Sequence, residues 1–296
     1  MRIVEVGPRD GLQNEKVPVP TDVKAQFVRD LRSAGLSEIE VTSFVSPKWV
    51  PQLADADDLL RLLLPDPLLS ALVPNERGLE RALNSGIERI ALFTAASDAF
   101  TQKNINMSVD ESLEVFKRVT DGFRAQHPGG FVRGYVSTAF DCPYSGRVEP
   151  SAVLSVIERL FDLGCSEVSI GDTIGTAVPL DVKRLIQAIQ HLPNGQIVWH
   201  FHDTRGSAIA CAAAALDAGY ESFDSSSAGL GGCPYAPGAG GNLATDDLVS
   251  FAERSGIKTG IDLDKLAKAS LAVLDVLGRS PAAKAQVAQL ASCSQP

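Results

Sequence analysis

Hydrophobic and polar positions follow two alternating periods along the 296-residue chain. Short apolar runs rich in β-branched residues recur, and each precedes a longer stretch whose apolar residues return every three or four positions. This alternation is typical of parallel βα units. The expected strands cover residues 3–6, 38–42, 69–73, 89–93, 132–137, 167–170, 197–201 and 222–225.

Amphipathic segments separate these strands. Several end in a residue pair such as Ala34-Gly35, Leu163-Gly164 or Ala218-Gly219, where glycine can adopt the left-handed conformation that ends a helix. A last barrel helix is expected to begin near Ala244. The other expected helices cover residues 21–34, 76–84, 110–125, 150–163, 180–191 and 207–218.

Eight such units over about 250 residues predict a closed (β/α)8 barrel. A doubly wound open sheet usually has fewer strands and a G-x-G-x-x-G turn after the first one, whereas this chain has Gly7-Pro8-Arg9-Asp10-Gly11 there. No internal repeat or Pro/Ser-rich linker divides the sequence. We therefore expect one catalytic domain over residues 1–278, including a C-terminal helix at 262–277, followed by a flexible tail at 279–296.

Composition narrows the class of protein. With 45% hydrophobic and 21% charged residues, the chain can form a substantial core. No apolar run approaches the roughly 20 residues of a membrane span, and an expected strand follows Met1 directly, so we expect a cytoplasmic protein with no membrane partner. A net charge of -9 without clustered Lys and Arg argues against nucleic-acid binding.

The five cysteines are odd in number and never form a C-x-x-C pair, which favours a reducing compartment over a disulfide framework. Four of them are expected to be buried thiols without a chemical role. Cys233 differs because it lies in the run 229–242, which is too rich in glycine and proline for an ordinary helix or strand. That run is either an active-site loop or a flexible connector that contains a thiol.

Polar residues accumulate where the expected strands end, and the loops that follow parallel barrel strands converge on one mouth. The residues at these positions are Arg9, Asp10, Gln13, Glu40, Lys103, Asn104, Asp172, His200, His202, Cys233 and Asn242.

His200 and His202 are two residues apart on one expected strand, so their side chains point to the same side. A single strand histidine is commonly structural, but a same-face pair is suited to binding one ion. Asp10 and Asn242 are candidates for adding oxygen ligands. Two imidazoles with carboxylate and amide oxygens favour Mg²⁺ or Mn²⁺ over a structural zinc site.

Arg9 has two interpretations. It either forms a local charge pair with Asp10 or presents its guanidinium to a carbonyl oxygen that becomes an enolate. Glu40 and Asp172 then orient Arg9 or contact the ligand, or they only satisfy backbone groups at strand ends.

Five segments together resemble the 3-hydroxy-3-methylglutaryl-CoA lyase family, over nearly the whole chain. They are residues 4–15 (VEVGPRDGLQNE), 42–52 (TSFVSPKWVPQ), 171–175 (GDTIG), the run His200-x-His202-Asp203-Thr204, and the loop 233–242.

The resemblance implies a (β/α)8 barrel that cleaves the CoA thioester to acetyl-CoA and acetoacetate with Mg²⁺ or Mn²⁺. It implies substrate polarisation by Arg9, supporting acids at Glu40 and Asp172, and a catalytic thiol at Cys233. The family's metal ligands fall on Asp10, His200, His202 and Asn242. The substrate-binding set that we predict comprises Arg9, Gln13, Lys16, Lys48, Lys103 and Asn104.

Two positions depart from the family pattern. Arg205 stands where tyrosine is often found, and Asp141 stands where glycine is common. Both are expected near the acyl pocket, where they leave open a related 3-hydroxyacyl-CoA as the substrate.

Two other classes compete with the lyase. Transferases such as isopropylmalate and homocitrate synthases run the related condensation forwards, but they commonly carry a long C-terminal extension. A non-catalytic CoA-binding scaffold would lose ligands or the thiol. Lys16, Lys48 and Lys103 contact CoA phosphates or are ordinary surface lysines. A homodimer is the default for a symmetric enzyme.

Overall fold

Eight parallel strands close into a barrel in the computed structural model, which describes residues 1–232 and 241–293. The order around the barrel is β1-β10-β9-β8-β5-β4-β3-β2, and β2 returns to pair with β1. The strands are β1 Arg2–Glu5, β2 Glu38–Ser43, β3 Leu69–Leu72, β4 Arg89–Ala95, β5 Phe131–Ser137, β8 Glu167–Asp172, β9 Ile197–Phe201 and β10 Ser222–Ser225.

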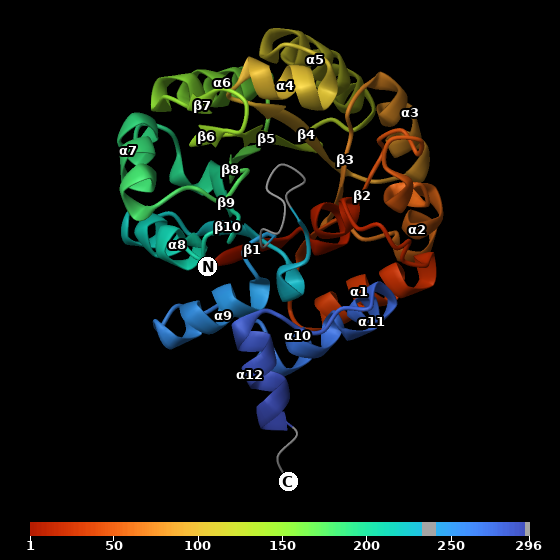
Figure 1. Ribbon diagram of the computed structural model, residues 1–296. Helices are drawn as coiled ribbons and strands as arrows, with labels where there is room; N and C mark the ends of the chain where they lie inside the picture. Colours follow the sequence, from red (N-terminus) through yellow and green to blue (C-terminus); the bar gives the residue numbers. More distant parts are fainter. Residues whose placement is uncertain (233–240, 294–296) are drawn as a thin grey trace.

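Helices form a ring outside the strands (Figure 1). Side chains at the N-cap positions stabilise the first turn of several of these helices. Ser108 and Glu111, for example, form a reciprocal capping box that satisfies backbone N–H groups at the start of α5. The helices of the ring are α1 Thr21–Ser33, α2 Ala56–Leu63, α3 Glu76–Ser85, α4 Asp98–Ile105, α5 Val109–Gln126, α6 Pro150–Asp162, α7 Pro179–Ile189, α8 Ala208–Asp217 and α9 Thr245–Arg254.

The barrel expected from the sequence is confirmed, with all eight strands at the predicted places. Gly35, Gly164 and Gly219 have φ of 106°, 89° and 85°, as predicted for the residue after a helix. The sequence analysis missed α2 and α4, since two helical turns are too short for a clear period. It also missed a small hairpin after β5, formed by β6 Asp141–Cys142 and β7 Gly146–Arg147.

The hydrophobic core lies between the barrel and the ring of helices. On β9, Trp199 and Phe201 point into this layer, where their rings stack with centroids 5.7 Å apart, and Tyr220 meets Trp199 edge-on. Alternation along the strand then directs the intervening His200 to the opposite, inner side. Because Trp199 and Phe201 pack on the outer face of β9, His200 faces the barrel interior.

The barrel interior contains a series of ion pairs. Arg2 on β1 contacts Glu167 on β8 at 2.6 Å, and Arg133 on β5 pairs with Asp224 on β10. Neither pair of strands is adjacent in the barrel, so these contacts cross its interior. Arg133 also lies 3.4 Å from Glu167, which joins the two pairs into one network. Buried charge is thus compensated in place.

The C-terminal part contains three helices, α10 Leu263–Ala269, α11 Leu271–Leu277 and α12 Lys284–Cys293. Ser270 separates α10 from α11, where one helix was expected. The expectation of a flexible tail over 279–296 is wrong for the ten residues of α12. Gln286 is fully buried and donates hydrogen bonds to Ala267 O and Ser270 Oγ, at 2.9 and 2.8 Å.

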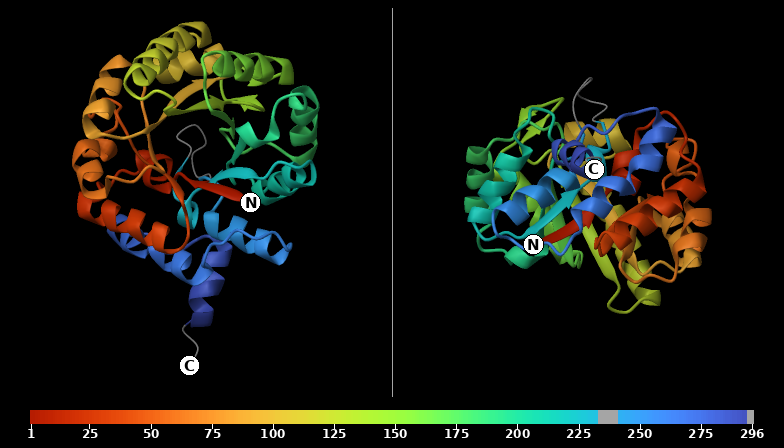
Figure 2. Two further views of the ribbon diagram at one scale, coloured as in Figure 1. Left: turned by 180° about the vertical axis from the view of Figure 1, so that it is seen from behind. Right: turned by 90° about the horizontal axis from the view of Figure 1, so that it is seen from below.

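Figures 1 and 2 show α12 beginning beside α9 and α10 and extending outward beyond the ring of helices. The described part of the chain has no helix of the length and apolar character that a membrane crossing requires.

Gln286→Ala is predicted to lower the free energy of unfolding by about 1–3 kcal/mol, because two buried partners on α10 and at Ser270 lose their donor. Urea unfolding measures the change. Gln289→Ala is the matched control, since Gln289 bonds Asp264 at the surface, and its effect should stay within about 0.5 kcal/mol. Equal effects of the two variants would contradict the anchoring role of Gln286.

Candidate functional site

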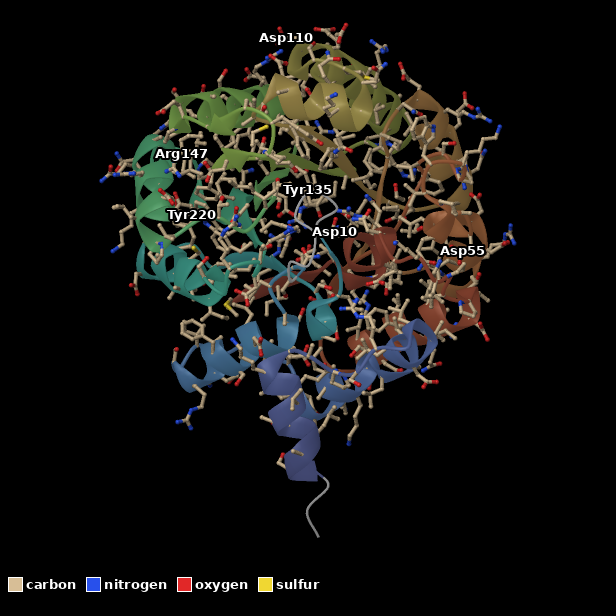
Figure 3. All side chains as sticks on the ribbon, viewed as in Figure 1. Asp10, Asp55, Asp110, Tyr135, Arg147 and Tyr220 are labelled. Atoms are coloured by element: carbon tan, nitrogen blue, oxygen red, sulfur yellow. The ribbon has the colours of Figure 1, made fainter. Side chains whose placement is uncertain are left out.

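A cavity opens at the carboxyl ends of the barrel strands, the position at which such barrels carry their active sites. Asp10 and Tyr135 lie near the barrel centre in Figure 3, whereas Asp55, Asp110 and Arg147 lie at its periphery. The cavity is lined by Arg9, Asp10, Gln13, Asn14, Phe93, Phe100, Asn104, Tyr135, Ser137, Thr173, His200, His202, Gly232 and Asn242.

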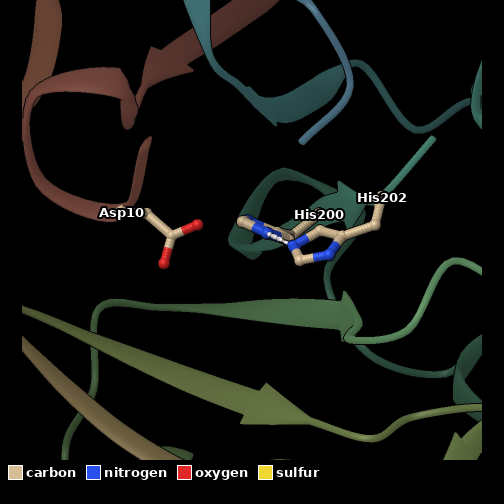
Figure 4. A group of neighbouring side chains, drawn as sticks. All are labelled: Asp10, His200 and His202. Carbon is tan, nitrogen blue, oxygen red and sulfur yellow. Dashed lines mark hydrogen bonds between the residues drawn. The ribbon is translucent and has the colours of Figure 1, made fainter. Parts of the chain in front are cut away.

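Asp10, His200 and His202 form a candidate metal centre (Figure 4). Each offers one ligand atom, and these atoms all lie within 4.8 Å of one another. The two Nε2 atoms of the histidines are 3.1 Å apart. Two nitrogen lone pairs this close repel each other unless a proton or a cation lies against them. The side chains therefore suit one shared cation.

The loop after β1 positions Asp10. Residues Gly7–Gly11 form a single wide turn in which the Asp10 and Gly11 amides both donate to Val6 O. A Cβ at Gly11 would approach Ser226 Oγ to 2.8 Å and Leu230 Cβ to 2.9 Å, so glycine permits the chain after β10 to pack here. The turn thus directs the Asp10 carboxylate toward the histidines.

Asn242 approaches the same centre. It pairs with His202 in an isolated antiparallel bridge, and its Nδ2 donates to Asp10 Oδ2 at 2.9 Å. Its Oδ1 is buried and has no hydrogen-bond partner among the residues that the structure describes. A buried amide oxygen without a donor is costly, and a hard cation would satisfy it. All four predicted ligands are therefore brought together with an oxygen and nitrogen donor set that fits a divalent ion.

The protonation of Asp10 and His202 suits a metal ion. Burial raises the pKa of Asp10, but the charges of Arg9, His200 and His202 outweigh it and lower that pKa to about 2. Burial, together with the neighbouring His200, lowers the pKa of His202 to about 4. At neutral pH the centre thus holds a carboxylate and an uncharged His202 imidazole.

Arg9 is nearly fully buried beside the centre. Its Nε pairs with Glu40, and its Nη1 contacts Asp10 Oδ1 at 2.7 Å. Tyr135 donates to Glu40 Oε2 at 3.0 Å, and the Arg9 guanidinium lies 5.4 Å from the Tyr135 ring centre. Glu40 is completely buried and does not line the cavity. It therefore orients Arg9, one of the three alternatives left open by the sequence.

Asp172 bonds backbone groups, which was one of the alternatives that the sequence left open. Its carboxylate accepts hydrogen bonds from the Thr176 and Ala177 amides at 3.0 Å and does not line the cavity. Burial raises its pKa to about 6. Asp172 holds the loop after β8, whose Thr173 does reach the cavity.

The two residues that depart from the family pattern also lie outside the cavity lining. Arg205 donates from Nη1 to the carbonyls of Ile174 and Gly175, at 2.8 and 3.2 Å. Asp141 faces Arg147 at 3.7 Å. Arg205 thus acts on the loop after β8 rather than on the cavity directly.

The remaining predicted residues divide into two groups. Gln13 and Asn104 line the cavity. Lys16, Lys48 and Lys103 are exposed and do not line it. Cys233 lies outside the described residues. The preceding Gly232 does line the cavity, and its carbonyl accepts a hydrogen bond from Asn14.

Several cavity residues were missed by sequence reasoning, notably Tyr135, Ser137 and Thr173. The alternation Arg133, Tyr135, Ser137 along β5 places three polar side chains on one face and was an available signal. Phe93 and Phe100 add an apolar wall. Asp224 was also missed, although its Oδ2 lies 3.1 Å from His200 Nδ1.

Comparison with known proteins gives concordant results. Residues 1–273 match the family model described as HMGL-like. A rat protein named mitochondrial hydroxymethylglutaryl-CoA lyase is 48% identical over 96% of this chain and 88% of its own length. The rat protein named cytoplasmic 3-hydroxy-3-methylglutaryl-CoA lyase is 47% identical over 91% of this chain and 79% of its own.

The fold agrees as well. A crystal structure of hydroxymethylglutaryl-CoA lyase from Pseudomonas aeruginosa superimposes with a TM-score of 0.94 and 47% identity, covering 98% of this chain and 97% of that one. With the family model, the relatives and the barrel in agreement over nearly its full length, the chain belongs to the HMGL-like family.

Proposed function

We propose that this protein is a metal-dependent lyase that cleaves 3-hydroxy-3-methylglutaryl-CoA to acetyl-CoA and acetoacetate. The observation that carries the proposal is the convergence of Asp10, His200 and His202 beside Arg9 in one cavity at the barrel mouth. Relatives at 47–48% identity named for this activity support the same reaction.

Asp10, His200, His202 and Asn242 would hold the divalent ion, which we propose to be Mg²⁺ or Mn²⁺ because oxygen donors accompany the imidazoles. When bound, the ion supplies Lewis acidity that lowers the pKa of the substrate's tertiary hydroxyl. This lowering of the hydroxyl pKa matters for proton transfer to a thiol. An ordinary alcohol has a pKa of about 16 and a thiol of about 8.5, a difference of roughly 10 kcal/mol.

Arg9 would stabilise the charge that develops during bond cleavage. Removal of the C3 hydroxyl proton converts that carbon to the ketone of acetoacetate, and the electrons of the C2–C3 bond move into the thioester. The resulting enolate oxygen accepts hydrogen bonds from the guanidinium, which Glu40 holds in position. Protonation at C2 then gives acetyl-CoA.

Cys233 is the proposed residue for proton transfer. It follows Gly232, which lines the cavity. A thiol can move a proton when a neighbouring cation stabilises its thiolate, and both Arg9 and the proposed ion would supply positive charge in this cavity.

The exposed Lys16, Lys48 and Lys103 follow the carboxyl ends of three strands and are proposed contacts for CoA phosphates. Gln13 and Asn104 are proposed to contact the acyl portion, since both line the cavity. The homodimer remains a prediction. So does the cytoplasmic location, because the rat relatives are named for two different compartments.

Purified protein supplied with Mg²⁺ or Mn²⁺ is predicted to release acetyl-CoA and acetoacetate from 3-hydroxy-3-methylglutaryl-CoA, and chelation by EDTA should abolish turnover because hydroxyl activation is lost. A coupled assay for acetoacetate measures the reaction, and longer-branched 3-hydroxyacyl-CoA analogues define the substrate range. Absence of acetyl-CoA from every substrate would sink the lyase proposal.

Cys233→Ala is predicted to reduce kcat by about 10²-fold or more while metal affinity is retained, because a proton-transfer group is lost and no ligand is removed. Steady-state kinetics and Mn²⁺ titration measure the two properties. Cys165→Ala is the control, since Cys165 is buried away from the cavity. Unchanged turnover in Cys233→Ala would remove the thiol from the mechanism.

His202→Ala is predicted to weaken Mn²⁺ affinity by at least about 10-fold, because one imidazole ligand is lost. Isothermal titration calorimetry measures this directly. His191→Ala changes a surface histidine that pairs with Glu158 and should leave the titration unaltered. Wild-type affinity in the His202 variant would contradict its assignment as a ligand.

A further inference from the structure

A buried carboxylate contacts one histidine of the candidate metal centre. Asp224 on β10 has a completely buried side chain. Its Oδ2 lies 3.1 Å from His200 Nδ1 and accepts a hydrogen bond from Ser169 Oγ at 2.7 Å. Its Oδ1 pairs with Arg133. Asp224 is not among the residues that offer a ligand atom to the centre.

These contacts determine which nitrogen His200 presents. A carboxylate at 3.1 Å favours the proton on Nδ1, where it can be donated to Asp224 Oδ2. The lone pair is then on Nε2, the atom that faces His202. The same hydrogen bond restricts rotation of the imidazole ring, so that Nε2 stays directed toward the centre.

His202 provides a contrast within the same site. Its Nδ1 is buried and has no hydrogen-bond partner within residues 1–232 and 241–293. Of the two imidazoles, only His200 is thus held by a buried carboxylate. The orientation of the pair depends on the contact between His200 and Asp224.

Besides its contact with His200, Asp224 is held by Arg133 and Ser169. Arg133 binds one oxygen and also lies 3.4 Å from Glu167, while the guanidinium stacks over the Tyr135 ring at 4.9 Å from its centre. Ser169 Oγ donates a hydrogen bond to the other oxygen. The carboxylate therefore cannot turn toward the metal centre without leaving buried partners unsatisfied.

We propose that Asp224 is a positioning residue that fixes the tautomer and ring orientation of His200 for cation binding. This inference rests on the proposed metal centre and extends it by one residue. Carboxylates that accept the second N–H of a metal-binding histidine typically change metal affinity by about 10- to 100-fold when they are replaced.

A purely structural role is the competing explanation, since Asp224 also neutralises the buried Arg133. Glu167 allows the two roles to be separated. It is a second buried interior carboxylate that contacts Arg133 and Arg2, but none of its hydrogen bonds or ion pairs involves His200. Glu167→Gln removes interior charge without altering the imidazole's partner.

The test is calorimetric titration with Mn²⁺ of wild-type protein, Asp224→Asn and Glu167→Gln, with the folded fraction of each measured by circular dichroism. Asp224→Asn is expected to bind Mn²⁺ about 10- to 100-fold more weakly, and raised Mn²⁺ should restore part of its turnover. Glu167→Gln should stay within about threefold of wild type although it loses stability. Equal weakening in both variants, or wild-type affinity in Asp224→Asn, overturns the positioning role.

Two further comparisons cover a variant that does not fold and a wild-type protein that does not bind Mn²⁺. If Asp224→Asn does not fold, Arg133→Met is compared with Arg133→Met/Asp224→Asn, where no unpaired guanidinium is left, and the same fold-change is expected. If wild-type protein takes up no Mn²⁺, the metal centre itself fails and the role of Asp224 falls with it. If wild type binds and Asp224→Asn binds equally, only the positioning role falls.

Discussion

Compensation of buried charge across the barrel interior is the constraint on which the rest of the structure depends. Arg2 and Arg133 reach over the interior to acids on strands that are not their neighbours, and so they connect distant parts of the barrel wall. Burying any one of these charges alone would be strongly unfavourable. These ion pairs lie in the barrel interior. One acid of the network, Asp224, contacts the candidate metal ligand His200.

The site above this network combines an anionic ligand set with a fixed cation. Asp10 and Glu40 carry negative charge, and Arg9 lies against both of them. A divalent ion would reverse the local excess of negative charge, which suits a substrate with a carboxylate and a carbonyl that becomes an enolate. Phe93 and Phe100 form an apolar wall of the same cavity.

Sequence periodicity predicted the barrel and the shared face of His200 and His202, because both depend on local spacing along strands. The partners of these residues depend on contacts between strands far apart in sequence, as with Asp224, and no local pattern reports them. For Asp172 the sequence left open whether its carboxylate meets Arg9, the ligand or backbone groups, and the hydrogen bonds that it accepts from the amides of Thr176 and Ala177 are seen only in the folded loop. Helix α12 was missed because its anchor, Gln286, is a residue type usually found on surfaces.

The bridge between His202 and Asn242 joins two candidate ligands that are 40 residues apart in the sequence. The Asp203 amide donates to Gly241 O and the Leu243 amide donates to Phe201 O, so the backbone on both sides of Asn242 is bonded to the end of β9 or to the residues just after it. A substitution that shifts the end of β9 would therefore displace Asn242 together with His200 and His202, so the spacing of these three candidate ligands changes as one unit.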